Sequence, residues 1–99
     1  MTELEQLQAS AAQAAALLKA MSNPRRLLIL CMLCGAPGTS AGELARATGL
    51  SASATSQHLA RMREEGLIDS TREAQRILYF IKNDAVNQLI STLKTLYCP

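Results

Sequence analysis

The stretch that most constrains the fold is ELARATGLSASATSQHLARMREEGLI, residues 43–68, because it reads as two helices separated by a tight turn. Gly49 lies at the turn and can take the left-handed backbone conformation that a sharp change of direction needs. Ser51 then caps a second helix, which is expected to run to about residue 65 and to stop at Gly66. The stretch therefore predicts a helix-turn-helix.

The second helix of this motif has one apolar side and one polar side. The expected core-facing residues are Ala52, Thr55, Leu59 and Met62, and the opposite side bears Ser53, Ser56, Gln57 and Ala60. Short hydroxyls and an amide without bulk suit a helix that enters the major groove of DNA, where such groups reach base edges and phosphates. A solvated helix face is the plain alternative for the same residues.

After Gly66 the pattern changes from helical to strand-like. The segment LIDSTREAQRILYFI predicts strands over 67–71 and 76–81, joined by a polar turn around Glu73 and Ala74. A hairpin directly after the second helix makes the motif a winged one. Its tip offers polar and basic side chains for phosphate or minor-groove contact, namely Arg72, Gln75 and Arg76. Turn glycine, polar helix face and wing together favour DNA binding over a solvated face.

Helices are expected on both sides of this motif. Strong helix formers fill 3–21, Asn23 and Pro24 start a helix over 25–34 that ends at Gly35, and Asn83 caps a final helix. The segment GAPGTS is read as a loop, followed by a short helix over 41–48 that a Ser40–Glu43 capping box starts. The predicted fold is mainly α with a small β-hairpin, in the order ααααββα, as a single domain over 1–99.

The first helix has a heptad-like stripe of apolar residues at alternating spacings of three and four. Its members are Leu4, Leu7, Ala11, Ala14, Leu18 and Met21. Such a stripe packs either on its own domain or against a second copy of the chain, and the segment is too short to decide between the two.

Composition sets wide limits on function. The chain has 99 residues, of which 48% are hydrophobic and 18% charged, and a formal net charge of +2 that permits a nucleic-acid partner without arguing for one. No secretion signal is evident, and the longest apolar run, 27–34, is far shorter than the roughly 20 residues needed to span a bilayer. The protein is therefore expected to be cytoplasmic, where three cysteines do not form a structural disulfide framework.

Signs of an enzyme are missing from the sequence. It has no paired-carboxylate signature, glycine-rich phosphate loop or credible Ser/His/Asp arrangement, so no catalytic residue is expected. His58 is the one histidine, and without further ligands nearby it is better read as a packing or phosphate-contacting group than as a metal ligand. No metal site is expected from this reading.

The segments LLKAMSNPRRLLILCML, LARATGLSASATSQHLARMREEGLI and REAQRILYFI resemble the ArsR/SmtB family of winged-helix bacterial repressors over nearly the whole chain. The resemblance implies a homodimer through the first and last helices that reads a pseudo-palindromic operator in double-stranded DNA and is released by an inducer. It places Ser53, Ser56, Gln57 and His58 on or near bases, and Arg61, Arg72, Gln75, Arg76, Arg25 and Arg26 near phosphates.

The cysteines bear on the inducer. Cys31 and Cys34 lie three residues apart, and hence on one side of their helix, whereas Cys98 is the penultimate residue. The ligand patterns of divalent-metal-sensing members are absent, since residues 39–49 contain no cysteine and the last helix no histidine. The chain instead resembles the thiol-based, sulfur-sensing subgroup typified by BigR, SqrR and YgaV, in which Cys31 and Cys98 match the paired positions and Cys34 is extra.

That resemblance implies a redox switch for persulfides and other reactive sulfur species. One thiolate attacks the sulfur species, the second closes the product into a disulfide or a sulfur-bridged link, and DNA affinity falls. From the residues alone, Cys31 and Cys34 also read as small buried hydrophobes, Cys34 more so.

The residues also leave other inducers open. They are peroxide-type oxidants, haem held by the Cys98–Pro99 dipeptide, and a thiophilic metal such as Cu(I) or an organometal held by the thiolates. From a different class, the chain could be a protein-interaction module without DNA binding.

Overall fold

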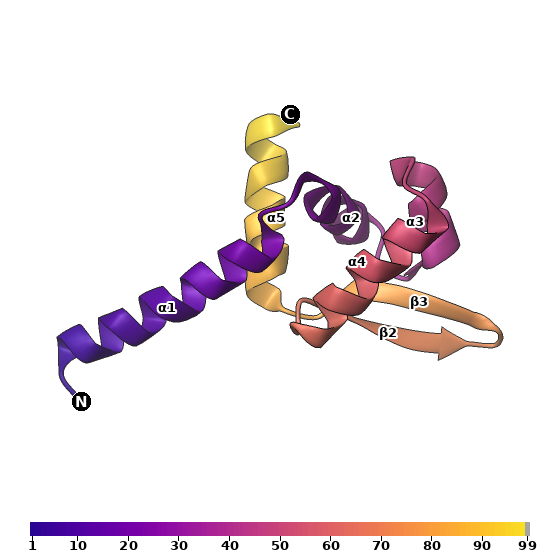
Figure 1. The fold of residues 1–99 in the computed structure, drawn as a ribbon. Helices are drawn as coiled ribbons and strands as arrows, with labels where there is room; N and C mark the ends of the chain where they lie inside the picture. The colour runs from indigo at the N-terminus through magenta and orange to yellow at the C-terminus, as the bar shows by residue number, and fades with distance from the viewer. Residues whose placement is uncertain (99) are drawn as a thin grey trace.

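A computed structural model describes residues 1–98 and contains five helices and three strands within them (Figure 1). In chain order these are α1 (Glu3–Met21), α2 (Pro24–Gly35), β1 (Thr39–Ser40), α3 (Ala41–Thr48), α4 (Ala52–Glu64), β2 (Ile68–Glu73), β3 (Arg76–Ile81) and α5 (Asp84–Tyr97). The predicted helices and the hairpin are confirmed, and the arrangement is a mainly helical fold with a helix-turn-helix (α3–α4) and a wing (β2–β3).

The short strand β1 corrects the reading of GAPGTS as a loop. Thr39 pairs with Tyr79 and Ser40 with Leu78, so the sheet has three antiparallel strands in the order β1-β3-β2. Gly38, at φ +85°, donates its N–H to the Tyr79 carbonyl at 2.9 Å and leads the chain into this pairing. A strand of two residues has no alternation to detect, and only its partner β3 defines it.

The wing is a regular hairpin whose register runs from Ile68 opposite Ile81 to Glu73 opposite Arg76. Ala74, in the turn, has a positive φ of 56°. The hairpin extends away from the helices, with α4 alongside its first strand (Figure 1). Side chains near the turn are exposed, whereas Ile68, at the start of β2, is buried in the core.

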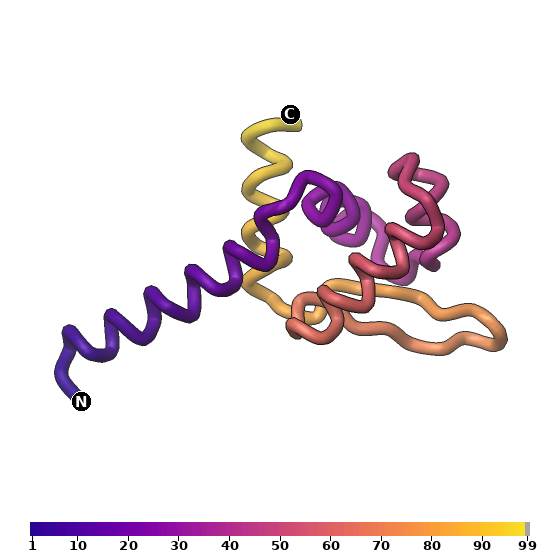
Figure 2. Tube along the Cα trace, viewed as in Figure 1, coloured from indigo at the N-terminus to yellow at the C-terminus, as the bar shows by residue number. Residues whose placement is uncertain are grey.

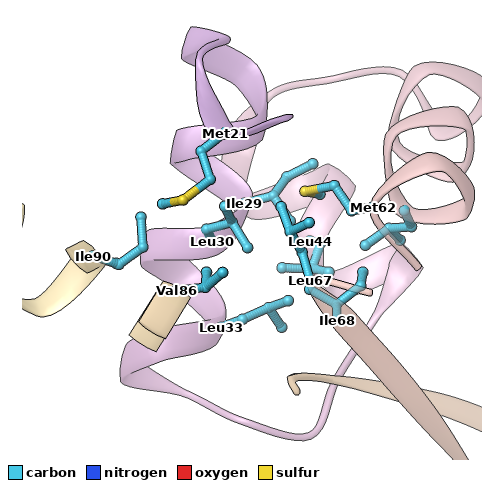
Figure 3. Close-up of a cluster of buried hydrophobic side chains, with 11 residues drawn as sticks. Met21, Ile29, Leu30, Leu33, Leu44, Met62, Leu67, Ile68, Val86 and Ile90 are labelled. Atoms are coloured by element: carbon cyan, nitrogen blue, oxygen red, sulfur yellow. The ribbon is translucent and has the colours of Figure 1, made fainter. Parts of the chain in front are cut away.

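Helix α2 lies at the centre of the hydrophobic core and packs against α5, α3 and β3 (Figure 3). Every element except β1 and β3 contributes fully buried or nearly buried apolar side chains to this core, which consists of Met21, Ile29, Leu30, Leu33, Leu44, Leu59, Met62, Leu67, Ile68, Val86 and Ile90. Because α2 contacts both α5 and the helix-turn-helix in a closely packed core, a displacement of α2 would change its packing against both.

Helix α1 leaves most of its length unpacked. Only its last turn joins the core, through Leu17, Ala20 and Met21, whereas Leu4 and Leu7 are 63% and 66% exposed. The Cα trace shows the N-terminal part of α1 extending away from the rest of the fold (Figure 2). Most of the predicted apolar stripe therefore does not pack on its own chain. No helix in the described part of the chain is long and apolar enough to cross a membrane.

Candidate nucleic-acid interface and thiol site

The helix-turn-helix is fixed by local hydrogen bonds at the start of both helices. The Ser40 hydroxyl accepts the N–H of Glu43 at 3.2 Å, and the Glu43 carboxylate accepts the Ser40 N–H in return, which completes the predicted capping box. Gly49 has φ +75°, and Ser51 caps α4 by accepting the N–H of Ala54 at 3.0 Å. These contacts set the angle at which α4 leaves the turn.

The polar face of α4 is exposed where the sequence placed it. Ser53, Ser56, Gln57 and Arg61 are all exposed, whereas Thr55, Leu59 and Met62 face the core. Thr55 is completely buried and its hydroxyl donates to the Ser51 carbonyl at 2.9 Å. Ala52 is exposed, and its expected place on the core-facing side is wrong because it is the first residue of α4 and the buried face begins at Thr55. The exposed side chains remain predicted DNA contacts.

His58 differs from its neighbours on α4. It is half-buried, and burial together with the nearby charges of Arg26 and Arg25 lowers its pKa. The imidazole is therefore held neutral beside the start of α2, on a different side of α4 from the exposed Ser56 and Gln57. A packing role accounts for this position, and base contact by His58 remains a prediction.

Of the three predicted DNA contacts on the wing, Arg72 and Gln75 are exposed, and Arg76 is ion-paired. The Nε of Arg72 donates to the Ala74 carbonyl at 3.3 Å. Arg76 instead forms an ion pair with Glu43, which ties the wing to α3. The Ser40 hydrogen bonds, helped by the charge of Arg76, lower the pKa of Glu43 and keep its carboxylate ionised.

The two arginines at the start of α2 have different surroundings. Arg25 is exposed. The Arg26 side chain is only 15% exposed, and its Nη1 donates to the Ala20 carbonyl at 2.8 Å and to the Glu65 carboxylate at 3.3 Å. Arg26 thus joins the end of α1, the start of α2 and the end of α4, a structural role that the sequence did not reveal.

The three cysteines lie on α2 and at the end of α5, two elements that pack against each other. Cys31 and Cys34 are half-buried on α2, Cys98 is exposed at the end of α5, and all three are free. Burial raises the pKa of Cys31, Lys94 acts in the opposite direction, and the Cys98 and Cys34 thiols raise it further. Cys98 therefore lies close enough to Cys31 for the two charges to interact.

Cys34 faces a different part of α5. It lines a surface hollow of about 520 Å³ together with Asn87, Gln88, Ser91 and Thr92. Cys98 lies seven residues beyond Ser91, which is roughly 10 Å farther along the helix axis at 1.5 Å per residue. Cys34 therefore lies against the middle of α5, whereas Cys98 follows its end.

Lys94 is the member of the thiol site that the sequence reading missed. Its Nζ lies 3.5 Å from the Cys31 carbonyl oxygen. The available signal was its position as the one lysine of the last helix, four residues before Cys98.

Metal and haem sites receive no geometric support from the described residues. Within 1–98 no three side chains of His, Cys, Asp or Glu come together as a ligand set for a metal ion. Pro99, half of the Cys-Pro dipeptide considered for haem, lies outside the described residues. The expectation that the chain binds no metal or cofactor stays a prediction.

Comparison with known proteins agrees with this geometry. Residues 23–70 match the family model described as "Bacterial regulatory protein, arsR family". The chain is 82% identical over 99 residues to the HTH-type transcriptional regulator YgaV of Escherichia coli, with all of both chains covered. It is 45% identical to the transcriptional activator HlyU of Vibrio cholerae, over 96% of this chain and 87% of HlyU.

Solved structures show the same fold. A predicted DNA-binding transcriptional regulator from E. coli superposes with a TM-score of 0.93 at 81% identity, over 96% of this chain and 100% of that one. The transcriptional repressor BigR of Xylella fastidiosa gives 0.86 at 33% identity, over 95% and 92%. The homodimeric winged helix-turn-helix DNA-binding domain Mb0332 of Mycobacterium bovis gives 0.78 at 28% identity, over 97% and 86%.

Proposed function

Because this chain belongs to the arsR family of bacterial regulatory proteins and is a DNA-binding transcriptional regulator, we propose that it represses transcription and releases its operator when Cys31 and Cys98 become covalently linked. The observation that carries the proposal is the packing of α2, which bears Cys31, against α5, which Cys98 directly follows. Family membership removes the alternative of an interaction module without DNA binding.

The proposed DNA contacts lie on two exposed features. Ser53, Ser56 and Gln57 on α4 enter the major groove, and Arg72 and Gln75 at the wing contact the phosphate backbone or the minor groove. Their side chains are exposed, and α4 is held rigidly by its cap and by its buried face. Arg25 and Arg61 add positive charge beside the same surface.

We take the DNA-binding unit to be a homodimer formed through α1 and α5. Helix α1 leaves the large apolar side chains Leu4, Leu7 and Leu18 exposed to water. A mostly apolar groove of about 600 Å³ between α1, α2 and α5 continues this surface. A second copy that covers α1 would also place two α4 helices for a pseudo-palindromic operator.

The proposed inducer is a small persulfide, R–S–SH. The exposed Cys98 thiolate attacks its outer sulfur, the S–S bond breaks, the thiol RSH leaves and Cys98 becomes a persulfide. The Cys31 thiolate then attacks the Cys98 sulfur, forms the Cys31–Cys98 disulfide and expels hydrogen sulfide. The two protein thiols lose two electrons, which reduce the transferred sulfur to sulfide.

The link changes DNA affinity through α2. It joins the C-terminal part of α2 to the end of α5, while the other end of α2 is bound through Arg26 to Glu65 at the end of α4. A displacement of α2 is therefore passed to α4, and two α4 helices that no longer match successive major grooves bind the operator less tightly.

The test is operator binding before and after treatment with a persulfide donor, with mass spectrometry of the same samples. Treated native protein is expected to lose roughly 5- to 150-fold in affinity, the usual span of allosteric coupling, and to contain a Cys31–Cys98 link. Cys31→Ser and Cys98→Ser are expected to keep binding DNA after treatment, whereas Cys34→Ser responds like the native chain.

Two results would reject the proposal. Treated native protein that holds its operator as tightly as reduced protein would show that the thiols do not respond to persulfide, and parallel titrations with hydrogen peroxide, haem and Cu(I) would then identify the input. Loss of DNA binding in treated Cys98→Ser would show that the link is not its cause.

A further inference from the structure

Lys94 reaches across from α5 to the C-terminal turn of α2. Its Nζ lies 3.5 Å from the Cys31 carbonyl oxygen, and a methyl group placed on Gly35 would lie 3.3 Å from the same nitrogen. The ammonium is thus seated against the last turn of α2. Cys98 directly follows α5, and its N–H donates to the Lys94 carbonyl at 2.8 Å, so the residue that reaches α2 is hydrogen-bonded to the residue that bears the second thiol.

The end of α2 is an unfavourable place for a thiolate. The C-terminus of a helix has a partial negative charge, and α2, all of which the structure describes, has no basic side chain in its last turn. Burial already raises the pKa of Cys31, and the Cys98 and Cys34 thiols add to that effect. Among the groups that act on Cys31, Lys94 alone favours its charged form.

The charged groups on α3 and β3, which also pack against α2, are not among the groups that act on Cys31. Glu43 and Arg46 lie on α3 and Arg76 on β3, and Arg76 forms its ion pair with Glu43. Tyr79 of β3 packs against the core. The charge that Cys31 meets therefore comes from α5 and from α2 itself.

We propose that Lys94 is a positioning residue of the Cys31–Cys98 switch, whose ammonium supplies the positive charge that the Cys31 thiolate needs in order to attack. The inference rests on the proposed function for its biological meaning. Lys94 takes no part in bond making. It stabilises the charge on Cys31 before the attack on the Cys98 persulfide, and through its hydrogen bond to the Cys31 carbonyl it holds α5 in register with α2.

A purely structural role for Lys94, as a cap on the carbonyls of α2, predicts a different outcome from a positioning role. Loss of a cap lowers thermal stability and leaves the reactivity of the Cys31 thiol unchanged. Loss of a nearby positive charge lowers the thiolate fraction of Cys31 and moves its reaction with an electrophile to higher pH.

The experiment measures the rate at which iodoacetamide alkylates Cys31, as a function of pH, in the full-length chain bearing Cys34→Ser and Cys98→Ser. Lys94→Met is expected to slow alkylation at neutral pH roughly two- to fivefold and to move the pH profile upward. Lys94→Arg should restore most of the rate because it keeps the positive charge. Lys82→Met, which removes an exposed lysine, is the matched control for net charge and should leave the profile unchanged.

Gly35→Ala tests the same contact while Lys94 is kept. The added methyl group displaces Nζ by a few tenths of an ångström, and an intermediate rate is expected. This variant and Lys94→Arg decide the matter if Lys94→Met fails to fold, which a thermal melt would show. Equal profiles for Lys94→Met and Lys82→Met, or a native profile in Gly35→Ala should Lys94→Met not fold, would overturn the proposal.

The assay contains neither DNA nor persulfide, so its result is separable from that of the proposed function. A Lys94-dependent profile in a protein that ignores persulfide would leave the charge effect standing and reject the switch. A persulfide-responsive repressor with a Lys94-independent profile would keep the switch and reject the role of Lys94.

Discussion

The two ends of α2 are held in different ways. At the N-terminal end, Asn23 accepts the N–H groups of Arg25 and Arg26 at 2.9 and 3.1 Å, and the Arg26 guanidinium binds both Ala20 and Glu65. The C-terminal end lacks a basic residue of its own. There two side chains from other elements donate to backbone carbonyls, the Thr39 hydroxyl to Ala36 at the C-cap and Lys94, at 3.5 Å, to Cys31.

This difference suggests a fixed end and an adjustable end of one helix. The thiols Cys31 and Cys34 lie toward the adjustable end, and the fixed end is the one bound to α4 through Glu65. In the proposed switch, a covalent link at Cys31 would pull on the adjustable end, and α2 would pass the displacement to the end that contacts α4.

The largest effect is expected at the middle of α2, because the helix must be held rigidly by the core to act as a lever. Leu30→Ala removes a side chain that is fully buried at the middle of α2 and should lower the free energy of unfolding by about 2–5 kcal/mol. Leu28→Ala, at a position 43% exposed on the same helix, should cost about 1 kcal/mol or less. Equilibrium unfolding in urea measures both, and equal losses would contradict the central place of α2.

The next effect concerns the fixed end. Arg26→Met removes the hydrogen bonds to Ala20 and Glu65 and should lower stability by about 1–2 kcal/mol, since the arginine side chain is only 15% exposed. Glu65→Gln, which weakens only the partly exposed ion pair, should cost no more than about 0.5 kcal/mol. If the two variants unfold at the same urea concentration, the carbonyl contact at Ala20 does not hold this end.

A smaller effect compares the two ends directly. Asn23→Ala removes the cap of α2 and should lower stability by about 1 kcal/mol. Gly35→Ala at the other end should change stability by less than about 0.5 kcal/mol, because a better helix former offsets the crowding of Lys94. Thermal melts of both variants provide the measurement, and a larger loss in Gly35→Ala would reverse the assignment of fixed and adjustable ends.

The smallest effect depends on pH at the fixed end. Burial, with the charges of Arg26 and Arg25, lowers the pKa of His58, so the unfolded chain takes up its proton at a higher pH than the folded chain. The contribution of neutral His58 to the free energy of unfolding is therefore complete above about pH 6.5, the ordinary histidine pKa. It is lost as the pH falls from there toward the pKa of His58 in the folded chain.

His58→Gln should accordingly flatten the decline in melting temperature between about pH 7 and pH 5. The carboxylates that also respond to acid are the same in both proteins and serve as the internal control. Parallel curves for native protein and variant would mean that His58 is not held neutral by its surroundings.

Local signals in the sequence were enough for most of the fold. Caps at Asn23, Ser51 and Asn83 and the turn at Gly49 placed the helices correctly, because each acts within a few residues of the chain. Strand β1 was not predicted, because two residues show no periodicity and these two pair only with a strand that is distant in the sequence.

The residues of the candidate sites also differ in whether a local sequence pattern could predict them. The exposed face of α4 followed from helical spacing, and Cys31 and Cys98 followed from a family resemblance. The contacts of Lys94 with α2 and of Arg26 with Glu65 join residues 63 and 39 positions apart, which no local pattern encodes. The sequence contained these residues, and only the packing of α2 against its neighbours gave them a role.

The most direct test of the account joins the two helices without any redox chemistry. In protein bearing Cys34→Ser, dibromobimane would bridge Cys31 and Cys98, and fluorescence anisotropy would measure operator affinity. A matched sample with both thiols separately methylated controls for loss of the thiols themselves. The account predicts that the bridged protein binds its operator at least about tenfold more weakly than the methylated protein. Equal affinity of the two samples would contradict the claim that a link between α2 and α5 controls DNA binding.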